Sequence, residues 1–250
     1  MHRFYVKGLA AVGSCVELGP DETRHMVRAL RLGPGAEVEL FDGSGRIALA
    51  RLTEISGARG RPGRTASAQV ISVREAEPDA DVRIALATAI PKGTRMAELL
   101  RACTELGADA FFPMVAERSA VRPPPGYVSE RWLRIAREAA GQSRRSCIPA
   151  IAPVCGFEDV LARRSEFDLA LLADADPGAR SLREVLPPPG AIRSALVLIG
   201  PEGGFTEDER ASAEAGGFVR ARLDGPVMRI ETAAVALCAA VLFACGRGRG

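Results

Sequence analysis

Strands and helices alternate along the chain after residue 77, and this alternation limits the fold more than any other feature. Apolar runs of strand length cover residues 83–90, 110–115, 168–173, 195–199 and 218–223. Helical patterns cover residues 94–106, 129–144, 181–186, 207–215 and 231–245. The alternation predicts an α/β domain over residues 77–250, in which helices cover both faces of a parallel sheet.

The first 76 residues are predicted to be mainly β. Strand-like runs at 3–6, 37–41, 47–53 and 69–73 are separated by turns. The segment 42–45, Asp-Gly-Ser-Gly, is typical of a hairpin. One helix is expected over residues 22–32, with Asp21 as its cap and Gly33-Pro34 at its end. These features predict a small barrel-like β domain over residues 1–76.

Composition excludes several classes of protein. Hydrophobic residues make up 47% of the chain, which is enough for a folded core. The six cysteines show no C-x-x-C spacing and there are only two histidines, so no metal site is expected. The apolar stretch 233–245 is too short to span a membrane comfortably, and free cysteines fit a reducing compartment, so a cytoplasmic protein is expected.

The first candidate site follows the strand that ends at Ile199. Residues 200–206 read Gly-Pro-Glu-Gly-Gly-Phe-Thr, and Thr206 with Glu209 forms a capping box for the next helix. Glycines let the backbone approach a ligand closely, and ligands of open α/β sheets lie at the carboxyl ends of strands. The usual dinucleotide and phosphate fingerprints are absent. A tight structural turn explains the same pattern, and the sequence alone leaves both interpretations open.

A second candidate site follows the strand that ends at Leu223. Asp224-Gly225-Pro226 forms a turn, and Arg229 and Glu231 lie where the last helix begins. Both charges have a simpler explanation, because an acidic residue stabilises a helix N-terminus and an arginine is often a solvated surface side chain. The spacing does not decide between these explanations.

The helix expected over residues 129–144 carries a third group of polar residues. Arg134, Glu138 and Gln142 share one helical face. A solvated charged face explains them, and so does a basic helix end that contacts an RNA backbone.

Taken together, these segments resemble the 16S rRNA (uracil-N3)-methyltransferase family of the SPOUT class, RsmE. The matching segments follow one another in order along nearly the whole chain: Lys92-Gly93, Glu105-Leu106-Gly107, Arg118-Ser119, Gln142-Ser143-Arg144, Gly200–Phe205 and Arg229–Ala233. Two positions in the last loop depart from the family pattern, since Asp224 replaces a glycine and Pro226 replaces an arginine. If position 224 needs a positive φ, aspartate will be strained there.

The resemblance implies an N-terminal PUA-like β-barrel that grips RNA and a C-terminal trefoil-knotted SPOUT methyltransferase domain. It also implies S-adenosyl-L-methionine as methyl donor, a homodimer, and 16S rRNA or the assembled small ribosomal subunit as partner. The residues expected at the cofactor are Leu172, Ile199, Gly200, Pro201, Glu202, Gly203, Gly204, Leu223, Gly225, Val227, Met228 and Thr232. The residues expected at RNA are Arg3, Lys7, Arg24, Arg28, Arg31, Arg118, Gln142, Arg144 and Arg145.

Three residues are expected to act in catalysis. Uracil N3 carries a proton at neutral pH, so it must lose that proton before it can attack a methyl group. Arg229 is expected to stabilise the resulting charge on the uracil oxygens. Glu231 or Glu202 is the expected base, and the sequence does not choose between them.

Three other functions compete with this hypothesis. The chain can be a non-catalytic RNA-binding or ribosome assembly factor that keeps the fold, or a SPOUT enzyme with a different RNA target. It can also be an ordinary nucleotide-binding α/β enzyme, although the missing fingerprints argue against that class.

Overall fold

The computed structural model describes residues 1–57, 64–77 and 80–246. The chain folds into two compact units. The first unit consists of Met1–Asp79 with Ala140–Ile148, and the second of Ala80–Ala139 with Pro149–Gly250. The sequence pattern, which marks a change of rhythm near residue 77, gave no indication that residues 140–148 return to the first unit.

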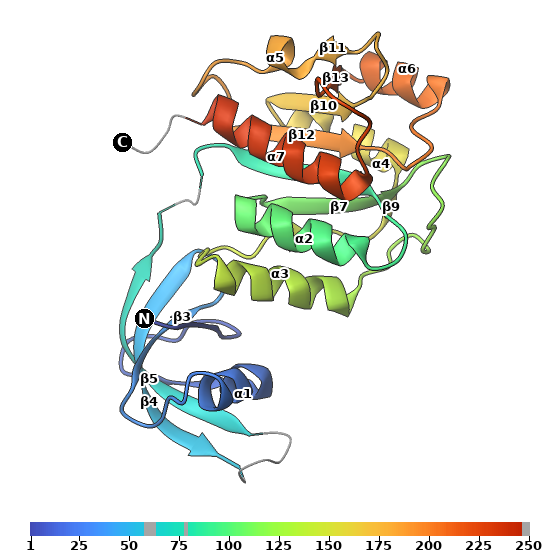
Figure 1. The fold of residues 1–250 in the computed structure, drawn as a ribbon. Coiled ribbons are helices and arrows are strands. Elements are labelled where there is room, and N and C mark those ends of the chain that lie inside the picture. The colour runs from blue at the N-terminus through green and yellow to red at the C-terminus, as the bar shows by residue number, and fades with distance from the viewer. Residues whose placement is uncertain (58–63, 78–79, 247–250) are drawn as a thin grey trace. The chain divides into compact units, whose positions relative to one another are not determined.

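In its described residues, the first unit contains a five-stranded sheet, the helix α1 and the last residues of α3 (Figure 1). Its strands, in the order β1-β3-β4-β5-β2, are β1 (Arg3–Tyr5), β3 (Glu37–Phe41), β4 (Arg46–Ser56), β5 (Thr65–Glu75) and β2 (Cys15–Leu18). The β1–β3 pair is parallel and the other pairs are antiparallel. Alternate strand residues point into one apolar cluster that includes Leu18, Met26, Val38, Leu40 and Leu52.

The structure confirms one sequence prediction for this unit and corrects another. The hairpin at 42–45 is confirmed, because β3 and β4 pair across it. The helix was placed wrongly: α1 runs over Pro20–Arg28, with Gly19 as N-cap and no side-chain cap. Proline is favoured at the first position of a helix, so α1 starts at Pro20. Arg31 has a φ of 55°, which a right-handed helix does not accommodate, so the helix does not reach residue 32. Strand β2 was not predicted.

Residues 140–148 complete the first unit by packing against its hairpin. Ala140 joins a small apolar cluster with Phe41 and Ile47. The Arg3 guanidinium donates to the carbonyl oxygens of Arg144 and Arg145. This segment is therefore part of the first core, although it lies far along the chain.

The second unit contains an eight-stranded sheet in which every pair of neighbouring strands is parallel. The main order is β11-β13-β10-β12-β6-β7-β8, and β9 also pairs with β7. The bounds are β6 (Arg83–Ala89), β7 (Ala110–Val115), β8 (Ala150–Ile151), β9 (Cys155–Gly156), β10 (Leu169–Ala173), β11 (Arg180–Ser181), β12 (Ser194–Ile199) and β13 (Val219–Arg222).

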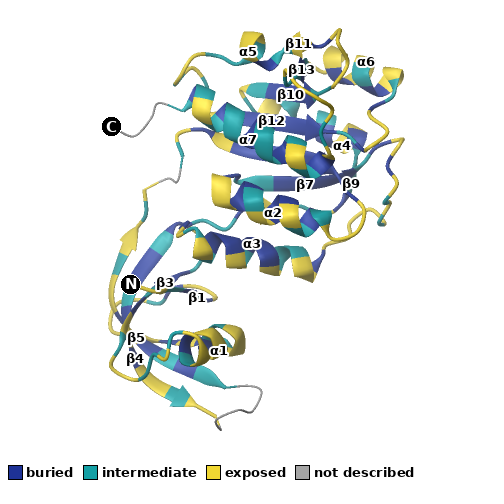
Figure 2. Cartoon of the chain, in the orientation of Figure 1, coloured by how far each residue is buried: buried dark blue, intermediate teal, exposed yellow. Residues whose placement is uncertain are grey.

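Helices cover both faces of this sheet, so its central strands are buried on both sides (Figures 1 and 2). The unit contains α2 (Arg95–Leu106), α3 (Glu130–Gln142, its last residues in the first unit), α4 (Phe157–Leu161), α5 (Leu182–Val185), α6 (Glu207–Ala215) and α7 (Ile230–Cys245), with a 3-10 turn at Arg164–Glu166. On one face α2 and α7 pack on Ile84 and Leu86, and on the other α4 and α6 pack near Ala85 and Ala87. The predicted parallel α/β fold is confirmed.

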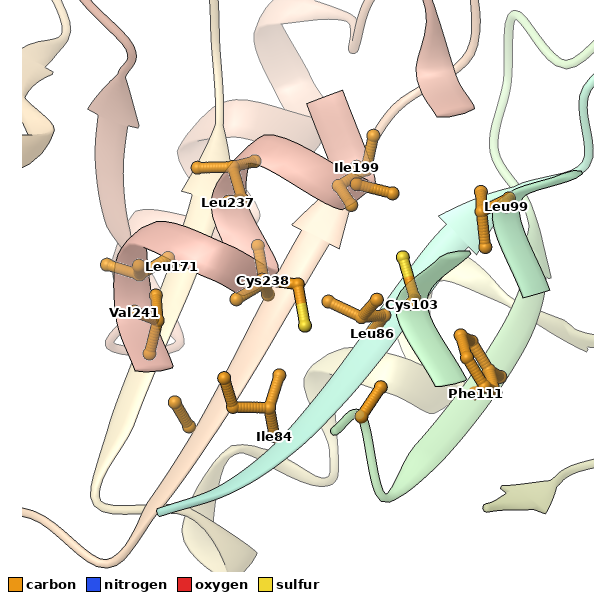
Figure 3. Close-up of a cluster of buried hydrophobic side chains, with 14 of the residues drawn as sticks. Ile84, Leu86, Leu99, Cys103, Phe111, Leu171, Ile199, Leu237, Cys238 and Val241 are labelled. Carbon is orange, nitrogen blue, oxygen red and sulfur yellow. The ribbon is translucent and has the colours of Figure 1, made fainter. Parts of the chain in front are cut away.

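The core between α2 and α7 contains two cysteines that behave as apolar side chains (Figure 3). Cys103 and Cys238 are fully buried and are not in disulfides. The hydrogen bond with Cys238 and burial together raise the pKa of the Cys103 thiol, so it stays protonated. The two thiols therefore help α2 and α7 to pack.

Candidate functional site

A cavity of about 630 Å³ opens at the carboxyl ends of three neighbouring strands in the second unit. Ala173, the last residue of β10, pairs with Ile199 of β12 and with Ala221 of β13, so the loops after these strands start side by side. Its walls come from residues 173–177, 199–205 and 221–230, together with Ala233 and Leu237 of α7. The volume is in the range of pockets that hold small organic ligands.

The loop after β12 is tightly constrained. Gly200 leaves no space for a side chain, because a Cβ there would lie 2.9 Å from the ring of Phe205, which is buried. Gly204 has a φ of 68°, and its N–H donates to the Pro201 carbonyl at 2.8 Å. Gly200 is therefore required by the close approach of the Phe205 ring, and Gly204 by its left-handed backbone conformation.

Glu209 fixes this loop to the segment that follows β7. Its Oε2 accepts from the Thr206 N–H at 2.9 Å, and the Glu209 N–H donates to the Thr206 hydroxyl, which completes the predicted capping box. Its Oε1 accepts from the Glu117 N–H at 2.8 Å. Arg118 adds a second link, donating through Nη1 to the Gly203 carbonyl at 3.1 Å.

The loop after β13 is held mainly through Asp224. Its carboxylate accepts from the Ser181 hydroxyl at 2.7 Å and from Arg222 Nη1 at 2.6 Å. Asp224 does not have a positive φ, so the strain expected from the missing glycine is absent. Beyond it, Gly225, Pro226 and Val227 are exposed, the last with 83% of its surface accessible.

The third wall of the cavity, residues 173–177, was not marked by the sequence. Asp174 lines the cavity, and its Oδ2 lies 3.1 Å from Arg220 Nη2 and 3.3 Å from Arg210 Nε. Both arginines are mostly buried, so the aspartate is held firmly. Its position directly after a predicted strand was the signal that could have identified it.

Arg95 is a second residue that the sequence did not mark. Its Nη2 donates to Glu202 Oε1 at 3.2 Å, and its Nη1 lies 3.8 Å from Glu231 Oε2. The two expected bases therefore share one guanidinium. Arg95 is the first residue of α2, directly after the loop that follows β6, and that position could have drawn attention to it.

The cavity brings together most of the residues expected at the cofactor. Lining residues from that set are Ile199, Gly200, Pro201, Glu202, Gly204, Leu223, Gly225, Val227 and Met228. Arg229, which is exposed, lines it as well, whereas Glu231 does not. Leu172 points into the apolar cluster on the opposite face of the sheet, Gly203 packs against Arg118, and Thr232 is exposed on α7.

The residues expected at RNA differ widely in exposure. Arg145 is 4% exposed, and the Arg3 side chain is 8% exposed and pairs with Glu39. Arg24 is exposed and lies 3.3 Å from Asp21. The exposed members of the set are Lys7, Arg24, Arg28, Arg31, Arg118, Gln142 and Arg144.

Neither a metal site nor a membrane helix is found in the described residues. They contain no group of three or more His, Cys, Asp or Glu side chains suited to hold a metal ion. In the same residues, no helix is long and apolar enough to cross a membrane.

Comparison with known proteins identifies the family. Residues 78–242 match the model of an RNA methyltransferase domain, and residues 18–59 match that of an RNA methyltransferase PUA domain. The chain belongs to this RNA methyltransferase family. The resemblance and the fold class drawn from the sequence, a PUA-like domain with a SPOUT-class α/β methyltransferase domain, are confirmed.

Relatives within the RNA methyltransferase family align over nearly the whole chain. The ribosomal RNA small subunit methyltransferase E of Synechocystis is 31% identical and covers 93% of this chain and 74% of its own length. The protein of that name from Mycobacterium bovis is also 31% identical, with coverages of 95% and 90%. The Neisseria gonorrhoeae protein of that name, solved bound to S-adenosyl methionine, is 30% identical with a TM-score of 0.84 and covers all of both chains.

Proposed function

We propose that this protein methylates N3 of a uridine in small-subunit ribosomal RNA, with S-adenosylmethionine as the methyl donor. The observation that carries the proposal is the cavity at the carboxyl ends of β10, β12 and β13, bounded by both loops singled out in the sequence. Two findings on relatives support the proposal. The Synechocystis relative is named ribosomal RNA small subunit methyltransferase E, and the Neisseria protein of that name was solved bound to S-adenosyl methionine. The uridine N3 target rests on the resemblance to the uracil-N3 family.

The residues around the cavity suit this donor chemically. Apolar side chains such as Ile199, Leu223 and Met228 can enclose an adenine ring, and exposed backbone groups of the two loops can bind its polar atoms. The carboxylates of Asp174 and Glu202 are compatible with a cationic ligand. We assign cofactor contact to the lining residues of both loops and to Asp174. Leu172, Gly203 and Thr232 do not line the cavity, and we propose that they contribute to cofactor binding through their backbone or through the residues that they contact. When bound, the cofactor supplies an electrophilic methyl group.

We assign the chemistry on the RNA side to Arg229 and a glutamate. Arg229 stabilises negative charge on the uracil carbonyl oxygens as N3 loses its proton. Glu202 is the preferred acceptor of that proton because it is a lining residue of the cavity, and Glu231 is the alternative. Alignment of the base in the cavity contributes the rest of the rate enhancement.

We propose that the RNA is held mainly through its phosphates. The exposed basic residues Lys7, Arg24, Arg28, Arg31 and Arg144 of the first unit and Arg118 of the second supply positive charge. Gln142 is a polar contact, and Arg3 and Arg145 shape the segment that carries Arg144. Affinity for small-subunit RNA should fall steeply as salt rises, and an affinity independent of salt would contradict these phosphate contacts.

Three further properties belong to the proposal. We propose a homodimer, because α7 carries no charged residue between Thr232 and Cys245 and leaves Phe243 91% exposed, and sedimentation of the intact protein measures this. We propose the trefoil knot because the family resemblance implies it, and the strand order β11-β13-β10 is compatible with it. We also propose a cytoplasmic location, because the proposed substrate is ribosomal RNA.

The function is tested by methyl transfer. Purified protein is incubated with radiolabelled S-adenosylmethionine and either naked small-subunit rRNA or assembled subunits, and the product nucleosides are identified by mass spectrometry. We expect 3-methyluridine. Binding of the cofactor without methyl transfer would favour a non-catalytic assembly factor, and a different methylated nucleoside would indicate another RNA target.

Replacement of Arg229 by alanine tests the catalytic assignment. We expect kcat to fall about 100-fold or more, because one preorganised donor to a developing anion is removed. Calorimetry should find the cofactor Kd within about threefold of the unaltered protein, because a group that acts only in the transition state adds little to ground-state binding. The matched control is Arg183→Ala, which removes an exposed arginine of α5 outside the cavity. Equal turnover in both variants would exclude Arg229 from the mechanism.

A further inference from the structure

We infer that Arg95 is a positioning residue that holds Glu202 and Glu231, and with them the two loops of the cavity, in the arrangement that cofactor binding requires. This inference rests on the proposed function and goes beyond it. Arg95 does not line the cavity, so it acts through the residues that it holds.

Arg95 joins three segments that are distant in sequence. Its Nε donates to the Lys92 carbonyl at 3.1 Å, which fixes the side chain against its own loop. Its Nη2 donates to Glu202 in the loop after β12, and its Nη1 faces Glu231 in the first turn of α7. The planar guanidinium can address these three oxygens at once because its donors diverge in a fixed fork. A lysine ammonium, a compact point charge, cannot reproduce this fork.

The negative charge of Glu231 explains why its contact with Arg95 matters for the local structure. The Glu231 side chain is 13% exposed, and its Oε2 is buried without a hydrogen bond among the described residues. Among the described residues, Arg95 is the cation that faces this oxygen, with Nη1 at 3.8 Å from it. Without the guanidinium, Glu231 would be left as an uncompensated, nearly buried charge, and Glu202 would lose the same partner.

The consequence reaches the cavity through two short connections. Glu202 lines the cavity itself. Glu231 is two residues from Arg229, the N-cap of α7 and the residue proposed to stabilise the uracil anion. Loss of Arg95 therefore releases both walls together, although neither is changed chemically.

The test measures binding as well as activity. Calorimetry with S-adenosylmethionine is carried out on the unaltered protein, Arg95→Ala, Arg95→Lys and the control Arg101→Ala, which removes an exposed arginine from the same helix. We expect Arg95→Ala to weaken binding about tenfold or more and Arg95→Lys to recover part of the loss. Arg101→Ala should stay within about twofold of the unaltered protein, since isolated surface charges contribute little.

The Glu231→Gln substitution separates positioning from a general loss of stability. In the unaltered background it should lower the melting temperature, because it removes the partner of Arg95. In the Arg95→Ala background it should raise the melting temperature, because it removes the uncompensated carboxylate. The two substitutions should also be non-additive in the cofactor Kd. Added methylguanidine should restore binding to Arg95→Ala and leave Arg101→Ala unchanged.

The outcomes distinguish the two proposals. If the unaltered protein binds no S-adenosylmethionine, the proposed function fails. If it binds but Arg95→Ala binds equally well, or if the effects of Arg95→Ala and Glu231→Gln simply add, the assignment of Arg95 is overturned. Should Arg95→Ala not fold, Arg95→Lys and Glu231→Gln carry the same comparison: each should weaken binding, and their effects on the cofactor Kd should be non-additive.

Discussion

The two loops of the cavity follow neighbouring strands and both contain glycine and proline, yet they are held in very different ways. The loop after β12 is fixed by the capping box, by the buried ring of Phe205 and by Arg118. The loop after β13 is exposed from Asp224 to Val227 and is tied through one carboxylate. The difference indicates that the first loop is formed before a ligand arrives, whereas the second can adjust to it.

The largest effect should come from Glu209→Ala. The substitution leaves the N–H groups of Thr206 and Glu117 without their acceptor and removes a capping interaction. We expect the free energy of unfolding to fall by about 3 kcal/mol, measured by urea denaturation. Glu207→Ala is the control on the same helix turn, where the side chain is 84% exposed, and it should cost less than about 1 kcal/mol. Equal losses would mean that the first loop is not fixed by Glu209.

A pair of glycine substitutions compares the loops directly. Gly200→Ala places a Cβ 2.9 Å from the Phe205 ring, so we expect a loss of about 2 kcal/mol of stability. Gly225→Ala meets no atom within 4 Å and does not have a positive φ, so we expect a change within about 0.5 kcal/mol. Thermal unfolding of both variants measures the difference. If Gly225→Ala were the more damaging, the second loop would be the constrained one.

A smaller effect than that of Gly200→Ala should come from Asp224→Gly, which introduces the residue that the family resemblance implies at this position. It removes two partly exposed contacts, to Ser181 and Arg222, so we expect a loss of about 1 kcal/mol or less and a cofactor Kd weaker by about threefold. Calorimetry checks the affinity, with Asp224→Asn as the control that keeps an acceptor for Ser181. Tighter binding in Asp224→Gly would indicate that Asp224 restrains the loop unfavourably.

The sequence predicted the α/β unit better than the cavity. Long apolar strands such as residues 194–199 are buried on both faces, so their pattern is strong, whereas β8, β9 and β11 have two residues each and carry almost no pattern. The glycines and the capping box marked the first loop. Arg95 and Asp174 were missed because their importance lies in partners far along the chain, Glu231 and Arg220, and no local pattern contains such pairings.

The placement of β13 between two earlier strands has a consequence for biosynthesis. During translation, β10 and β11 leave the ribosome well before β13, which must then pair with both of them. The cavity needs β13, the loop behind it and Leu237 of α7, so a nascent chain that lacks these residues has no complete binding site. The enzyme therefore becomes competent only near the end of its own synthesis, and the late pairing of β13 is the step most exposed to misfolding.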